Sequence, residues 1–173
     1  MAKGLLLLFT GKGKGKSTAA FGLAFRALGH GLPVCVIQFL KGNRRTGEVK
    51  AAGRFRDLLD FHVLGRGFTW KSDNLKEDRR LARDAWKLAC RTIAANSHRL
   101  IILDELTYLI RYNFLSEQEV IEVLTSRPPE MHVVVTGRDA TRGLMDAADL
   151  VTEMQPVKHP YEQGISAQKG IEF

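Results

Sequence analysis

The chain has 173 residues, of which 45% are hydrophobic and 26% are charged. This length and composition are typical of one globular domain over residues 1–173, and they give no indication of disorder. The formal net charge of +7 favours an anionic partner, but the basic residues are spread along the chain, so we expect no nucleic-acid partner. No apolar segment has the length of a membrane span, and we expect no membrane partner and a cytoplasmic location.

The cysteines and histidines indicate no metal or disulfide framework. Cys35 lies within an apolar run and Cys90 within a predicted helix, so both are interpreted as small hydrophobic residues of a reducing compartment. The five histidines lack the spacing of a structural zinc site.

The first predicted strand, residues 5–9, leads into a turn rich in glycine and lysine, followed by a predicted helix over residues 19–28. Glycines in the turn allow backbone N–H groups to converge on an anion at the positive end of the helix. Lys16 supplies a cation for phosphate oxygens, and Ser17 offers a hydroxyl to phosphate-bound Mg²⁺. The sequence therefore predicts a phosphate-binding loop, the alternative being a surface turn. Its candidate nucleotide-binding residues are Gly11, Lys12, Gly13, Lys14, Gly15, Lys16, Ser17 and Thr18.

One position departs from the general P-loop pattern G-x-x-x-x-G-K-[ST]. Gly15, Lys16 and Ser17 match it, but Thr10 stands where the first glycine belongs.

Residues 34–39 form the second predicted strand, and the resulting βαβ order indicates a parallel sheet. We predict a polar loop over residues 41–53, at an edge of the sheet where ligands bind in such folds. Gln38 is a candidate nucleotide-binding residue. Glu48 is another candidate, although a solvated loop also explains it.

A third predicted strand, residues 61–64, precedes a glycine-containing loop that carries Phe68 and Trp70. These aromatic side chains either enter the core or contact a flat apolar partner. Ser72 or Asp73 is predicted to cap a helix over residues 74–95.

The apolar strand over residues 100–103 ends in Asp104 and Glu105. After a P-loop, such acids hold Mg²⁺ directly or through water, whereas the alternative is an acid at a helix N-terminus. Either of the two carboxylates could be the direct metal ligand.

The remaining pattern continues the alternation of helices and strands. A capping box predicts a helix over residues 116–125, and residues 132–136 and 150–154 are predicted strands on either side of a short helix ending near residue 148. Arg138 follows the first of these strands and could bind phosphate or form a surface ion pair. The tail over residues 156–173 has no predicted structure.

Taken together, these motifs resemble the P-loop corrinoid adenosyltransferases of bacteria. The matching stretches are residues 9–22, 38–42, 67–70, 103–108, 136–138 and 156–159. The resemblance implies a P-loop NTPase-like (RecA-like) α/β fold with a mostly parallel sheet flanked by helices. It also implies transfer of the 5′-deoxyadenosyl group of ATP to the Co(I) centre of cobalamin or a precursor corrinoid, with release of triphosphate.

The resemblance further implies roles for individual residues. Thr10 matches a family variant associated with ATP bound in the reversed direction. Phe68 and Trp70 match the aromatic pair that holds the corrinoid and displaces its lower axial ligand, and with Lys16 they are the expected catalytic residues. The expected metal ligands are Ser17 and Glu105, with Asp104 as the other candidate, and the expected nucleotide contacts include Arg26 and Arg138.

The same resemblance implies a homodimer and an electron-donating reductase or flavodoxin as a partner. An ordinary P-loop ATPase or kinase that releases ADP is the alternative function, in which Glu105 would orient water or an acceptor hydroxyl. A nucleotide-gated binding module without turnover is a third class. Phe68 and Trp70 favour the transferase, because a hydrolase has no use for them.

Overall fold

The computed structural model describes residues 3–40, 42, 46–65 and 75–172. Six strands of this part of the chain form one sheet in the order β3-β2-β4-β5-β1-β6, and all their pairings are parallel. The strands are β1 (Leu6–Thr10), β2 (Val34–Gln38), β3 (Leu59–Val63), β4 (Leu100–Asp104), β5 (His132–Thr136) and β6 (Leu150–Glu153). The predicted α/β class is confirmed, and a wholly parallel sheet brings the carboxyl ends of these strands to one edge.

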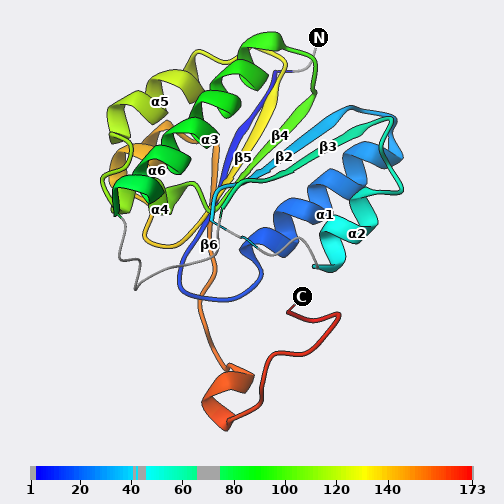
Figure 1. The fold of residues 1–173 in the computed structure, drawn as a ribbon, viewed down its shortest axis with the longest axis vertical. Coiled ribbons are helices and arrows are strands. Elements are labelled where there is room, and N and C mark those ends of the chain that lie inside the picture. Colours follow the sequence, from blue (N-terminus) through cyan, green and yellow to red (C-terminus); the bar gives the residue numbers. More distant parts are fainter. Residues whose placement is uncertain (1–2, 41, 43–45, 66–74, 173) are drawn as a thin grey trace.

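Helices cover both faces of the sheet (Figure 1). They are α1 (Lys16–Gly29), α2 (Gly47–Ala52), α3 (Leu75–Ala95), α4 (Thr107–Arg111), α5 (Glu117–Thr125) and α6 (Arg142–Ala147). In Figure 1, α1 and α2 lie on one face, and α3 and α5 lie on the other. A 3₁₀ helix, η1 (Pro160–Gln163), lies in the tail.

The two faces carry separate apolar clusters because successive strand residues point to opposite sides. Ile102 of β4 packs with Ala20 and Ala24 of α1, whereas Ile101 packs with the cluster around Trp86 of α3. Burial on both faces explains the nearly continuous apolar runs of β2 and β4. The shared sheet supports a single domain over residues 1–173, which stays a prediction.

Two short α-helices were not predicted. The prediction of a polar loop over residues 41–53 is wrong for its second half, which forms α2, and α4 follows β4 directly. Thr46 precedes α2 in an extended conformation, and the Lys50 amide donates to its carbonyl. Helices of five or six residues are too short for their apolar spacing to reveal them.

The starts of α5 and α1 can be compared with the sequence signals that predicted them. The predicted capping box is confirmed on one side, because the Ser116 hydroxyl accepts a hydrogen bond from the Glu119 amide at 3.1 Å. Helix α1 begins three residues before the predicted position, directly after Gly15 with φ of 111°. The glycine turn therefore leads directly into the first turn of α1.

The turn after β5 is held close to α4. Gly137 has φ of +146°, and a Cβ atom there would lie 1.9 Å from Thr107 Oγ1. The same hydroxyl donates a hydrogen bond to the Arg138 carbonyl at 2.7 Å. The missing side chain at residue 137 thus lets α4 fix the backbone that carries Arg138.

We expect Gly137→Ala to lower the free energy of unfolding by about 2 kcal/mol or more, because the new methyl group collides with Thr107 and the backbone favours glycine. Gly22→Ala is the matched control, since a Cβ atom there meets nothing within 4 Å. This control should be neutral or stabilising by up to about 1 kcal/mol, because alanine favours the helix. Urea denaturation of both variants measures the difference, and equal stabilities would contradict the packing argument.

Candidate active site

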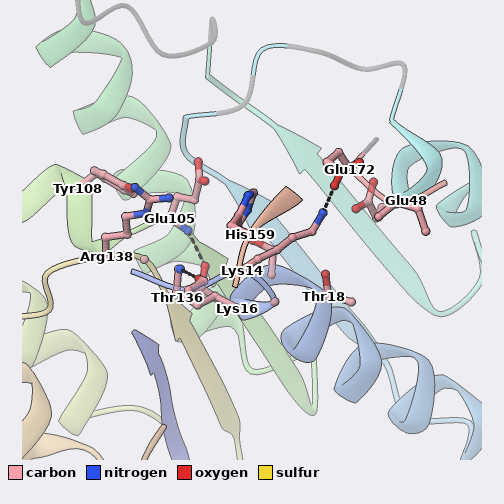
Figure 2. Close-up of a pocket in the computed structure, with 15 residues that line it drawn as sticks. Lys14, Lys16, Thr18, Glu48, Glu105, Tyr108, Thr136, Arg138, His159 and Glu172 are labelled. Carbon is pink, nitrogen blue, oxygen red and sulfur yellow. Dashed lines mark hydrogen bonds and ion pairs between the residues drawn. The ribbon is translucent and has the colours of Figure 1, made fainter. Parts of the chain in front are cut away.

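A cavity of about 430 Å³ lies at the carboxyl edge of the sheet (Figure 2). Its wall includes the glycine turn and the start of α1, the turns after β4 and β5, Glu48 of α2, and part of the tail. In open parallel sheets this edge is where ligands bind, so the location agrees with the sequence prediction.

The glycine turn packs against the end of β6, where only glycine fits. Cβ atoms at Gly11 and Gly13 would lie 2.5 and 2.7 Å from the Met154 carbonyl oxygen. The Gly13 amide donates a hydrogen bond to that oxygen at 2.7 Å, and the Met154 amide donates to the Thr10 carbonyl at 2.9 Å. The loop conformation is therefore fixed by backbone contacts with its neighbour strand.

The start of α1 faces the cavity. Lys16, Ser17 and Thr18 of the first helical turn line it, and the N-cap residue Gly15 provides no side-chain hydrogen bond. The first amides of a helix lack intrahelical acceptors and carry partial positive charge. This end of α1 is suited to an anion such as a phosphate group.

The Lys16 ammonium is held by the loop itself. Its Nζ atom donates hydrogen bonds to the carbonyls of Gly11 at 2.8 Å and Gly13 at 2.5 Å. Burial lowers the pKa of Lys16, and the positive charge of Arg138 lowers it further, against the opposing effect of Glu105. An anion in the cavity would stabilise the charged form of this lysine.

Asp104 lies behind the cavity and joins three strands. It is fully buried, and its two carboxylate oxygens accept hydrogen bonds from Thr136 Oγ1 and Gln38 Nε2, both at 2.8 Å. The Thr136 hydroxyl also accepts from the Glu105 amide at 2.9 Å. These bonds connect β2, β4 and β5 where the strands end.

Glu105, unlike Asp104, lines the cavity. Its backbone has φ of +66°, a conformation unusual for a residue with a side chain. Figure 2 shows Glu105 beside Tyr108 and Arg138 on one side of the site. The strained turn thus separates two adjacent carboxylates, one into the core and one into the cavity.

The structure brings most of the predicted site residues together. The cavity-lining members of the predicted set are Gly13, Lys14, Gly15, Lys16, Ser17, Thr18, Glu105 and Arg138. Glu48, a candidate that a solvated loop could also have explained, lines the cavity as well.

Other predicted site residues lie elsewhere. Gly11 is a buried residue of the loop, Lys12 is exposed, and Gln38 is buried against Asp104. Arg26 is exposed on α1, about 15 Å along the helix axis from Lys16 at 1.5 Å per residue. Phe68 and Trp70 lie outside the described residues.

Some residues of the cavity were not predicted as site residues. Tyr108, Thr136 and His159 fall within the matching stretches, but no role was assigned to them. Ile171 and Glu172 come from the tail, whose sequence shows no periodic pattern that could have indicated this position.

The donor atoms of the cavity fit Mg²⁺ delivered with a nucleotide. Ser17 and Glu105 both line it and offer hard oxygen ligands. Among the described residues, no group of three or more His, Cys, Asp or Glu side chains could hold a metal ion by itself. Mg²⁺ commonly binds through one or two protein oxygens plus substrate phosphates, and these residues suit that arrangement.

Comparison with solved structures shows the fold. The flagellar accessory protein FlaH of Methanocaldococcus jannaschii superposes with a TM-score of 0.60 at 13% identity, over 88% of this chain and 72% of that one. A KaiC-like protein of Pyrococcus horikoshii gives a TM-score of 0.55 at 16% identity, over 91% of this chain and 75% of that one. The described part of the chain has a P-loop NTPase-like fold. None of the helices in this part is long and apolar enough to cross a membrane.

Sequence comparison shows the family. A corrinoid adenosyltransferase of Pseudomonas aeruginosa is 46% identical over 171 residues, covering 99% of this chain and 84% of the relative. A corrinoid adenosyltransferase of Escherichia coli K12 is 43% identical over 176 residues, covering 99% of this chain and 86% of the relative. The family described as ATP:corrinoid adenosyltransferase BtuR/CobO/CobP matches residues 2–173, and the chain belongs to this family.

Proposed function

We propose that the chain transfers the 5′-deoxyadenosyl group of ATP to the Co(I) centre of a corrinoid and releases triphosphate. The observation that carries this proposal is the joint placement of Lys16, Glu105 and Arg138 around one cavity, in a member of the ATP:corrinoid adenosyltransferase family. Loop amides, cations and a carboxylate at the edge of a parallel sheet suit a nucleotide polyphosphate with its metal ion.

The reaction needs no general base from the protein. Co(I) provides the electron pair of the new cobalt–carbon bond, while the bond between C5′ and its oxygen breaks and leaves its own electron pair on the departing triphosphate. The protein must align C5′ with cobalt and stabilise the departing negative charge. Lys16, Arg138 and the first amides of α1 supply positive charge for that purpose, and binding ATP in the reversed direction would suit departure of the whole triphosphate.

We assign different roles to the two acids after β4. Glu105, with Ser17, would hold Mg²⁺, which would neutralise part of the phosphate charge. Asp104 would keep the Glu105 turn in place through Thr136, and Gln38 would act through Asp104 rather than on the nucleotide. The burial of Asp104 and the cavity position of Glu105 support this division.

The corrinoid would be cobalamin or a precursor, contacted by Phe68 and Trp70. An apolar face made by these side chains would exclude water and the lower axial ligand, which makes reduction to Co(I) easier. An electron-donating reductase or flavodoxin, a homodimer and a cytoplasmic location stay predictions from the sequence and its resemblance.

The first experiment is anaerobic incubation with Mg-ATP and chemically reduced cobalamin. We expect adenosylcobalamin and triphosphate in equal amounts, measured by the light-sensitive cobalamin spectrum and by phosphorus NMR. Lys16→Ala should lower the rate at least about 100-fold, because the charge of the leaving group loses its principal cation. ADP and phosphate without a new cobalt–carbon bond would instead indicate an ATPase, and nucleotide binding without any product would indicate a binding module.

The second experiment separates the two carboxylates. Glu105→Gln should raise the Mg²⁺ concentration needed for half-maximal activity about tenfold or more, without loss of stability. Asp104→Asn should lower the free energy of unfolding by about 1–3 kcal/mol, because Gln38 and Thr136 lose a buried charged acceptor. Magnesium titrations and urea denaturation measure both effects. If Asp104→Asn raised the Mg²⁺ requirement and Glu105→Gln did not, Asp104 would be the metal ligand.

The third experiment tests the aromatic pair. Trp70→Ala should reduce the rate about tenfold or more when cobalamin must be reduced on the enzyme, because the lower ligand would remain bound. The effect should be smaller when free cob(I)alamin is supplied. Equal rates of wild type and variant in the first assay would show that Trp70 plays no part in removing that ligand.

A further inference from the structure

The tail after β6 returns to the phosphate loop. Figure 1 shows it leaving the sheet below β6 and then turning back toward the sheet. Gly164 and Gly170 adopt φ of 73° and 86° in this segment, which are turn conformations suited to glycine. Residues at its end, Ile171 and Glu172, then line the same cavity as Lys16.

Glu172 forms an ion pair with Lys14 of the phosphate loop. One of its carboxylate oxygens accepts a hydrogen bond from Lys14 Nζ, as Figure 2 shows, and the other accepts from the Gln168 amide at 2.6 Å. These two contacts lower the pKa of the Glu172 carboxyl, so the side chain is negatively charged at neutral pH. A carboxylate therefore already pairs with a lysine of the predicted phosphate loop, at the wall of the same cavity.

Little else holds the tail in place. Within residues 155–172 only His159 is partly buried, and the others are exposed. The side chains of Lys14 and Glu172 are themselves 40% and 27% exposed. A partly exposed ion pair is weak, so a polyphosphate of higher charge can displace it.

We propose that Glu172 competes with the polyphosphate for Lys14. It pairs with Lys14 in the free enzyme and dissociates from it when ATP or triphosphate binds. This proposal rests on the proposed function, because it requires the loop to bind phosphate. Its consequence for the reaction is weaker binding of both substrate and product polyphosphate. Return of the carboxylate to Lys14 then favours release of the triphosphate.

Binding of inorganic tripolyphosphate, measured by calorimetry at low salt, tests the competition directly. Glu172→Gln should bind it about two- to fivefold more tightly than wild type. Glu162→Gln is the matched control, since it removes the same charge from the same tail at a residue that does not line the cavity. It should bind as wild type does.

A second background tests whether the effect passes through Lys14. In Lys14→Gln protein, the further change Glu172→Gln should leave the affinity unaltered, because the competing pair is already absent. In wild type, the NMR signal of the Gln168 amide should shift when tripolyphosphate is added, as its bond to Glu172 is released. No such ligand-dependent release should be seen in Glu172→Gln.

Three results would overturn the competition. These are equal or weaker binding by Glu172→Gln, a similar gain in Glu162→Gln, or a gain that persists without Lys14. Lys16→Ala tests separately whether the phosphate loop binds tripolyphosphate. If wild type and Lys16→Ala bound tripolyphosphate equally, the proposed function would fail along with the competition, whereas Lys16-dependent binding without an effect of Glu172 would refute the competition alone.

Discussion

The buried carboxylate of Asp104 is the constraint on which this edge of the sheet depends. A fully buried acid is costly unless it is hydrogen-bonded, and Asp104 meets that cost with donors from β2 and β5. Those donors, Gln38 and Thr136, sit at the last positions of their strands. The carboxyl ends of three parallel strands are therefore fixed relative to one another. This also fixes the starting positions of the turns that follow them.

Two of those turns gain their shape from unusual backbone conformations. After β4, the positive φ of Glu105 directs its side chain into the cavity. After β5, the absent side chain of Gly137 allows Thr107 to hold the Arg138 carbonyl. Such strain persists only where surrounding contacts determine it. Here the Thr136 hydroxyl links the two turns, because it donates to Asp104 and accepts from the Glu105 amide.

The sequence predicted the sheet well because its strands are short apolar runs bounded by turn residues, and because the glycine turn marks the start of α1. It also predicted Lys16, Ser17, Glu105 and Arg138 as neighbours, since each follows or begins an element at the same edge. It could not separate Asp104 from Glu105, because only the backbone turn distinguishes them. The short helices α2 and α4, and the return of Glu172 to Lys14, depend on tertiary contacts without a periodic local signal.

Thr10 shows how a departure from a general motif becomes explicable in the fold. The residue is only 3% exposed. Its hydroxyl accepts a hydrogen bond from the Ala140 amide at 3.2 Å, and its carbonyl accepts one from the Met154 amide. A glycine at this position would lose the first bond. The loop is thus tied to both the turn after β5 and the end of β6. Those same segments carry Arg138 and the start of the tail, so the contacts of Thr10 hold the phosphate loop against both of them.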